Sequence, residues 1–435
     1  MLTPNSARAP GRLSVAGLSI NGVLLFATSF LVIASGFTSM RPDIMGLRLH
    51  PFLIPVGIAF PVVLATRISE FPPRIMTSLM VFTGIYTFSI FNGRTFDFGE
   101  VFKVLTSIVT IITCALLVRK RGDMVAGSIG LSLAIALLAV KGLQEPMTRH
   151  GIEVMEGTNK NSYSMFALPA ILLAGYVPLR MPTVPLVFRA ILIATSLPSL
   201  VVIFMSGNRS GYVCAALVGL MLFWDRRGKG LLMVGGIAAA VMFFIVNFGT
   251  TKIFDEKVKE TMSGYGGDRL RQDIILSCID IGFENPLIGV SPQTLPWEIG
   301  RRIQVKHGES VIESHNVFAH IWGASGILCF MSLLAVAWTM CAYKPKNGVR
   351  IGGAEDPLRD AVKLLRMMVI LWAARGFFTR DILYNPSFCI GLGLAIGLCM
   401  LADVARAQTA TGRGPERSGQ PPLPFGARGP APRIA

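Results

Sequence analysis

Long apolar runs recur along the chain and constrain its fold more than any other feature. Examples are residues 15–37, 231–249 and 387–404. Each is about as long as a helix that crosses a bilayer. Only helices and closed barrels satisfy backbone hydrogen bonds inside hydrocarbon, and these runs are continuous rather than alternating. We therefore predict an all-α polytopic membrane protein.

Composition supports this class. Of the 435 residues, 52% are hydrophobic and only 15% are charged, whereas soluble domains carry about 25% charged residues. The first run is too long for a cleavable signal, and further spans follow it. The net charge of +16 is typical of basic residues that set membrane topology, so we expect no nucleic-acid partner.

The apolar runs predict about twelve transmembrane helices. They lie near residues 17–37, 50–66, 74–92, 99–118, 123–141, 164–179, 185–205, 210–224, 230–249, 316–342, 362–378 and 386–404.

Basic clusters predict the orientation of these spans. If both termini are cytoplasmic, every cluster falls on the cytoplasmic side, as the positive-inside rule requires. The clusters contain Arg8, Arg12, Arg67, Arg74, Arg119, Lys120, Arg121, Arg226, Arg227, Lys229, Lys344, Lys346, Arg350, Arg359, Lys363, Arg406, Arg413 and Arg417.

Three regions follow from this topology. Residues 1–404 form a transmembrane domain, and residues 250–315 within it form a long external loop between spans nine and ten. We expect short amphipathic helices in that loop. Residues 405–435 are rich in Gly, Pro and Arg and predict a disordered cytoplasmic tail. The seven cysteines contain no CxxC pair, so we expect neither a disulfide framework nor a zinc site.

The turn SGNRSG, residues 206–211, separates two apolar runs at the external surface. Asn208 or Ser210 is a suitable N-cap for the helix that follows. Arg209 then stands at a helix N-terminus, where a cation is unfavourable unless an anion binds beside it. The alternative is that Arg209 reaches lipid headgroup phosphates.

The loop segment 264–290 predicts an amphipathic helix. Asp268 is a candidate N-cap, apolar residues follow at helical spacing, and Asn285-Pro286 ends the helix. Arg269 and Arg271 lie in its first turn, which makes a phosphate site. The alternative is pairing of these arginines with acidic neighbours or lipid.

The tenth span opens with Glu313, Ser314, His315 and Asn316. With Ser314 as the N-cap, His315 lies in the first turn, where the helix dipole favours neutral imidazole. A neutral imidazole can accept a proton from a hydroxyl, and Glu313 can orient it or act itself. A histidine that only caps the helix fits the same sequence.

Arg375 follows the apolar stretch MMVILWAA directly. A charge at membrane depth is costly and suggests a functional role. Its alternative role is to reach the lipid headgroups.

In this order the motifs resemble the bacterial O-antigen ligase and O-antigen polymerase superfamily. The resemblance lies in GTNKNSY before a span, the SGNRSG turn, GGDRLRQDIILSCIDIGFENPLIGV in the long loop, and SHNVFAHIWGASGI opening the next span. It covers residues 150–345 best. It implies glycan transfer from undecaprenyl diphosphate, at the periplasmic face of the bacterial inner membrane, to an acceptor glycan or lipid A-core. It implies no metal or other cofactor.

The resemblance also implies residue roles. Arg209 and Arg269 match the family arginines, and we assign them to the diphosphate with Arg375 as a third. His315 matches the family histidine and would receive the acceptor proton or position the acceptor hydroxyl. Further expected substrate contacts are Arg271, Asn208, Asn316 and Glu313. Polymerase and ligase share these features. The competing readings are a transporter of polysaccharide or lipid-linked sugar and a non-catalytic scaffold.

Overall fold

The structure, a computed structural model, is almost entirely helical and describes residues 19–37, 40, 43–44, 47–93, 97–145, 154, 162–206, 208–223, 267–307, 314–345 and 357–410. Its elements are α1 (Ile20–Phe30), η1 (Leu31–Gly36), β1 (Asp43–Ile44), β2 (Leu47–Arg48), α2 (Leu53–Arg67), η3 (Ile68–Glu70), α3 (Pro73–Phe91), α4 (Phe98–Leu117), α5 (Arg121–Gln144), α6 (Ser162–Arg180), α7 (Leu186–Met205), α8 (Arg209–Phe223), α11 (Gly267–Glu284), α12 (Leu295–His307), α13 (Val317–Cys341), α14 (Pro357–Gly376), η4 (Asp381–Tyr384) and α15 (Pro386–Ala410). The strands β1 and β2 form a small antiparallel pair.

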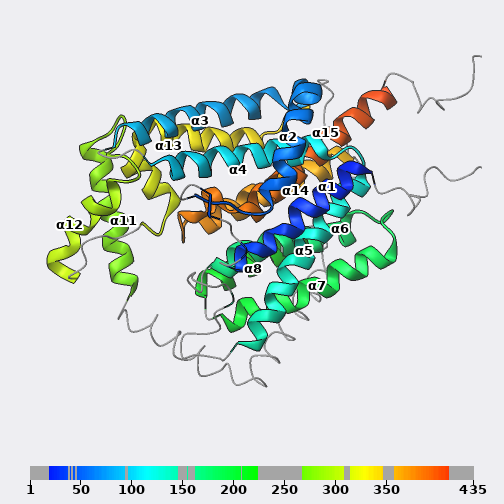
Figure 1. Cartoon of the computed structure of the whole chain (residues 1–435), viewed down its shortest axis with the longest axis horizontal. Helices are drawn as coiled ribbons and strands as arrows, with labels where there is room; N and C mark the ends of the chain where they lie inside the picture. The colour runs from blue at the N-terminus through cyan, green and yellow to red at the C-terminus, as the bar shows by residue number, and fades with distance from the viewer. Residues whose placement is uncertain are drawn as a thin grey trace, which may run out of the picture.

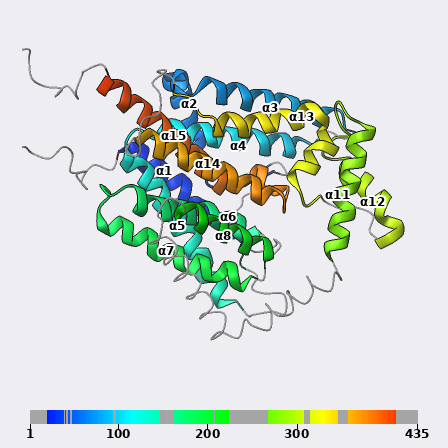
Figure 2. The same cartoon turned by 180° about the vertical axis from the view of Figure 1, so that it is seen from behind.

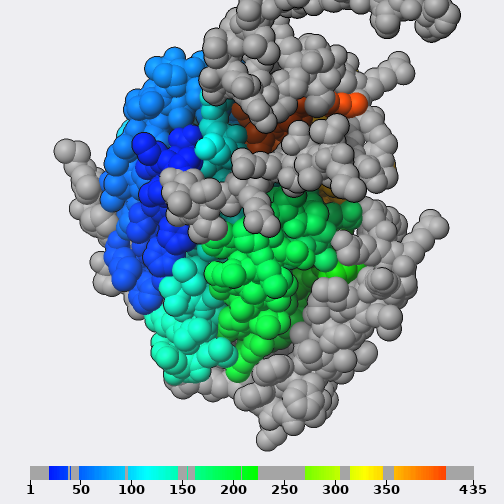
Figure 3. All heavy atoms as spheres, turned by 90° about the vertical axis from the view of Figure 1, so that its right-hand side faces the viewer, coloured from blue at the N-terminus to red at the C-terminus, as the bar shows by residue number. Residues whose placement is uncertain are grey.

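Most helices run along one direction, and α11 and α12 cover one end of the bundle (Figures 1 and 2). We call this the α11 end. The C-terminal part of α15 lies at the other end, which we call the opposite end. Figure 3 views the molecule from the opposite end, where the blue N-terminal helices lie beside green α7.

Eight helices in the described part of the chain are long and apolar enough to cross a membrane. Two apolar helices, Ile20–Gly36 and Arg209–Phe223, are shorter. A multi-pass membrane protein is therefore confirmed, whereas a count of twelve is not. The predicted span 230–249 lies outside the described residues, and every other predicted span overlaps a described helix.

Small residues let the helices pack closely. On α5, a Cβ at Gly130 would lie 2.6 Å from the Phe26 carbonyl oxygen of α1. On α15, a Cβ at Gly397 would lie 2.6 Å from the Ala115 carbonyl oxygen of α4. Apolar side chains gain little by leaving lipid, so close backbone approach and dispersion hold membrane helices together.

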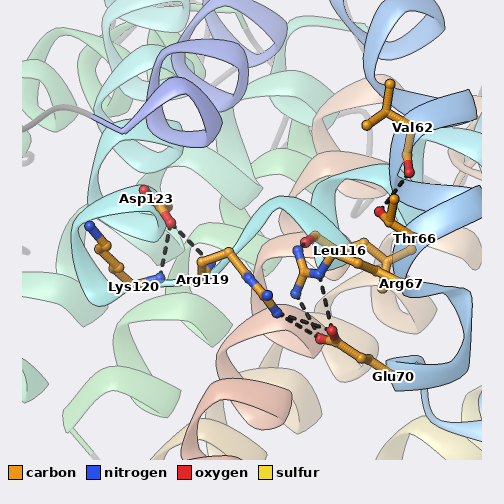
Figure 4. A network of polar contacts seen from close by, with 8 residues as sticks. All are labelled: Val62, Thr66, Arg67, Glu70, Leu116, Arg119, Lys120 and Asp123. Carbon is orange, nitrogen blue, oxygen red and sulfur yellow. Dashed lines mark hydrogen bonds and ion pairs between the residues drawn. The ribbon is translucent and has the colours of Figure 1, made fainter. Parts of the chain in front are cut away.

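A polar network ties α2 to the α4–α5 connection at the opposite end (Figure 4). Glu70 accepts hydrogen bonds from Arg67 and Arg119, at 2.8 Å each for the nearest atoms. Asp123 accepts the backbone N–H groups of Arg119 and Lys120 at 2.9 Å. Arg67, Arg119 and Lys344 surround one depression here. These are members of the basic clusters from which we predicted the cytoplasmic side.

The loop helices pack on the first half of α13. Ile274, Cys278 and Ile281 of α11 are buried against Ala319 and Ala324 of α13, and α12 adds Leu295, Ile299 and Ile303. The predicted amphipathic helix is thus confirmed, and it ends at Glu284 before Asn285-Pro286 as expected. It begins at Gly267, so Asp268 lies inside the helix and is not its N-cap.

Helix α13 is broken at Gly326, which has φ 71° and ψ −173°. The segment that follows α11 hydrogen-bonds to the break. Val290 N donates to Gly323 O at 3.2 Å, Ser291 N to Ala324 O at 2.8 Å, and Ile327 N to Pro286 O at 2.7 Å. Irregular backbone is tolerated at membrane depth where protein satisfies it, and this segment does so.

Helix α15 continues to Ala410, past residue 405 where we predicted the tail to begin. Residues 411–435 of the predicted tail lie outside the described residues.

Candidate functional site

The SGNRSG turn starts α8 at Arg209, as predicted. Asn208 is the N-cap, because its Oδ1 accepts the backbone N–H of Gly211 at 3.3 Å and the Ser210 hydroxyl at 2.7 Å. Its Nδ2 donates to Ser164 Oγ of α6 at 2.7 Å. Asn208 is buried and therefore fixes the start of α8 against the start of α6.

Arg375 closes this network from the last turn of α14. Its guanidinium donates to Ser210 Oγ and, at 3.1 Å, to Ser164 Oγ. The side chain is 0% exposed. The interpretation that Arg375 reaches outward to headgroups is therefore wrong, because the residue points into the protein at the meeting point of α6, α8 and α14. A buried arginine is costly unless charge and hydrogen bonds compensate it.

Two further arginines are linked to Arg375, one through the neighbouring residue and one through its charge. Arg209 is half-buried and directly precedes Ser210, which Arg375 contacts. Arg271 is exposed on α11, and its charge acts on the Arg375 guanidinium. We call Arg209, Arg271 and Arg375 the arginine cluster. The side chain of Arg269 lies outside the described residues, so its predicted role is not tested.

The start of α13 differs from the prediction. Asn316, not Ser314, is the N-cap, and its Oδ1 accepts the backbone N–H groups of Phe318 and Ala319 at 2.9 and 3.0 Å. His315 therefore precedes the helix instead of lying in its first turn. It is half-buried. Asn316 is the N-cap because its side chain is placed to accept hydrogen bonds from two free N–H groups.

The same Asn316 ties α13 to the end of α14. Its Nδ2 donates to Phe377 O at 3.3 Å. A Cβ at Gly376 would lie 2.7 Å from Val317 Cγ1. The segment containing His315 is thus held beside the end of the helix that carries Arg375. Glu313 lies outside the described residues.

Ser314 has another partner, which sequence reasoning missed. Its hydroxyl lies 2.7 Å from Nδ1 of His320, one turn into α13. His320 is buried, and Nε2 has no hydrogen-bond partner in the described part of the chain. The interaction fixes the backbone immediately before His315.

A second polar group, also missed, surrounds Glu100 at the start of α4. Glu100 of α4 accepts a hydrogen bond from Tyr86 at 3.1 Å and another from Tyr384, and Lys103 lies 3.3 Å from its other oxygen. Burial raises the pKa of Tyr384 well above its usual value, and the nearby Tyr86 and Glu100 add to this. Tyr384 therefore stays protonated as a donor. The acidic residue near the start of an apolar run was the signal available in the sequence.

No set of three His, Cys, Asp or Glu side chains within the described ranges is arranged to hold a metal ion.

Arg209, Arg271 and the broken α13 lie in the segments that carried the resemblance. Residues 194–334 match the family model described as O-antigen ligase. This stretch of the chain is similar to the O-antigen ligase family. This match confirms the resemblance read from the motifs, although it covers less than half of the chain. No curated protein matches the chain.

The matched residues 194–334 include Asn208, Arg209, Arg271, His315 and Asn316. Arg375 follows this stretch in the chain and reaches it through Ser210. Only the structure shows that Arg375 contacts the SGNRSG turn.

Proposed function

We propose that this protein transfers a glycan from undecaprenyl diphosphate to an acceptor hydroxyl at the external face of the bacterial inner membrane. The single observation that supports this most is the buried Arg375, bound to the SGNRSG turn beside Arg209 and within electrostatic reach of Arg271. An anion that binds several guanidinium groups compensates the cost of their mutual repulsion.

The reaction follows from elementary chemistry. The acceptor oxygen attacks the anomeric carbon of the glycan while the bond from that carbon to the diphosphate oxygen breaks. Negative charge grows on the departing diphosphate. Cations placed in advance stabilise that charge and lower the barrier, and one such interaction contributes about 10²–10³ in rate.

His315 is the proposed proton acceptor. It lies just outside α13, on backbone held by the Ser314–His320 and Asn316–Phe377 hydrogen bonds. Because the acceptor hydroxyl loses its proton as it attacks, a neutral imidazole at this position takes up that proton. Arg375, Arg209 and Arg271 bind the diphosphate, and Arg269 remains a candidate for the same role.

Glycan profiling of a strain that lacks the gene tests the proposal. We expect glycan to accumulate on the lipid carrier. Single repeats on lipid A-core would indicate a polymerase, and unmodified core with intact chains on the carrier would indicate a ligase. Loss of secreted polymer alone would indicate an exopolysaccharide enzyme. Unchanged glycans would contradict the proposal and favour transport.

A further inference from the structure

A cavity of about 550 Å³ opens at the α11 end between α4, the start of α6 and the η4–α15 segment. Its volume is within the range of small-molecule sites, which is about 300–1,000 Å³. Phe52, Phe102 and Phe166 supply apolar surface, and Glu100, Arg380 and Tyr384 supply polar groups. Such a mixture suits a ligand that presents both hydroxyl groups and C–H surface.

Glu100 is held as an acceptor in the wall of this cavity. It is 7% exposed. Its Oε1 receives both phenol hydroxyls, and among the described residues its Oε2 receives only Lys103. A carboxylate has about four acceptor positions, two on each oxygen. One position on Oε2 therefore remains for a donor from the cavity, such as a ligand hydroxyl.

Three hydroxyl groups along α4 are, like Glu100, available as hydrogen-bond acceptors. Thr106 donates to Phe102 O at 2.8 Å, Ser107 to Lys103 O at 2.8 Å, and Thr110 to Thr106 O at 2.7 Å. Each hydroxyl proton is thus used within the helix, and the oxygen lone pairs stay available as acceptors. All three residues line the cavity.

The charges in the cavity wall balance. Lys103 and Arg380 oppose Glu100 and Asp381, and each cation has one of these carboxylates within 4 Å, at 3.3 and 3.8 Å. The arginine cluster differs, because the charge of Arg271 repels the Arg375 guanidinium while that of Asp381 attracts it. A diphosphate therefore favours the arginine cluster, and an uncharged ligand favours the cavity.

The cavity and the arginine cluster share structural elements. Ser162 in the first turn of α6 lines the cavity, and Ser164 in the same turn binds Arg375. Arg380, on the cavity wall, follows Arg375 in the short connection after α14. The donor sugar is joined directly to the diphosphate and must lie at the arginine cluster, so the cavity across the α6 turn is left for the other substrate.

We infer that this cavity binds the acceptor sugar, with Glu100 accepting a hydrogen bond from one of its hydroxyls. The assignment of the bound sugar as the acceptor rests on the proposed function. Binding of an uncharged, hydroxyl-rich ligand follows from the cavity itself. Glu100 is a positioning residue here, since His315 remains the proton acceptor.

Cysteine protection tests the inference. In a Thr106→Cys variant of the full protein, a water-soluble maleimide reaches the cavity, and wild-type protein measures background labelling. The probes are the acceptor oligosaccharide released from its lipid by mild acid, which carries no diphosphate, and undecaprenyl diphosphate, which carries no sugar. We expect the oligosaccharide, at ten times its Kd, to slow labelling by about tenfold, and undecaprenyl diphosphate to have no effect.

Protection by undecaprenyl diphosphate alone, or by neither probe while the wild type transfers glycan, would overturn the inference. A wild type that transfers no glycan, yet is protected by the oligosaccharide, would contradict the proposed function and leave the sugar site standing.

A cavity-filling pair provides the second measurement. Thr106→Phe should lower transfer by about 10²-fold, because displacement of a reactant by about 1 Å costs that much. Leu105→Phe is the matched control on the neighbouring residue, which is 46% exposed and does not line the cavity. Its transfer should stay at the wild-type level. Equal activity of the two variants, at equal membrane abundance, would also count against the cavity as a substrate site.

Discussion

Gly289 and Gly326 lie in contact segments that fit only because neither residue has a side chain. Both have positive φ, 72° and 71°. A Cβ at Gly289 would collide with the backbone of Ala324, and one at Gly326 would lie 2.5 Å from the Leu287 carbonyl. The two glycines let the end of the NPLIGV segment, residues 285–290, dock into the break in α13, the helix that begins just after His315.

Replacement of Gly326 by alanine should destabilise the protein. Positive φ alone costs an ordinary residue about 1–2 kcal/mol, and displacement of the Leu287 backbone adds to that. We expect lower membrane abundance and a lower Tm in detergent. Gly84→Ala in α3 is the control, because its Cβ meets nothing within 4 Å. Equal Tm values for the two variants would show that the break in α13 is not held as described.

Replacement of Arg375 by alanine should abolish glycan transfer, with a loss of about 10²–10³-fold or more from a single electrostatic donor. Arg375→Lys should also be poor, because lysine cannot donate in a planar fork to both Ser210 and Ser164. Arg359→Ala, an exposed arginine on the same helix, should transfer normally. Normal glycan from Arg375→Ala on a gel would remove the residue from the site.

Arg209→Ala and His315→Ala should each abolish transfer while membrane abundance stays near normal. Arg209 would bind the diphosphate and His315 would accept the proton. Arg209→Lys should remain poor for the same geometric reason as above. Glycan gels and immunoblots of complemented deletion strains measure both quantities. A variant that restores normal glycan would exclude its residue from the mechanism.

Asn208→Asp separates helix capping from site electrostatics. Aspartate caps a helix about as well as asparagine, so α8 should keep its start. Its carboxylate, however, lies beside the Arg375–Ser164 hydrogen bond and competes with the diphosphate for the arginine, so transfer should fall by about 10²-fold. Asn208→Ser keeps a capping oxygen without the charge and should lose less. The opposite ranking at equal abundance would contradict the anion site.

Cys278 should resist alkylation in the folded protein. Burial between α11 and α13 raises the pKa of its thiol to about 12, and only the thiolate reacts. A raised pKa means that the thiol stays protonated as pH rises through 8 and 9, so iodoacetamide should not modify it there. Denaturation should expose it and restore the normal pKa of about 8.5. Mass spectrometry before and after denaturation measures the change, and rapid native modification would show that α11 does not cover it.

The helical class and most span positions were predictable because apolar length reports directly on the bilayer. The start of α8 at Arg209 and the end of α11 before Asn285-Pro286 were also predictable, since caps and prolines act locally. The N-cap of α13 was not, because Ser314, His315 and Asn316 are all acceptable there. Tertiary contacts decided it: His320 engages Ser314, and Phe377 engages Asn316.

The sequence by itself determined that this chain is a multi-pass membrane protein with a stretch similar to O-antigen ligases, because hydropathy and local motifs need no partner to be read. Only the tertiary structure decided that Arg375 is buried against the SGNRSG turn, that NPLIGV fills the break in α13, and that Glu100 meets Tyr384. These contacts join residues far apart in the chain, and their partners are chosen by helix packing, which no local pattern encodes.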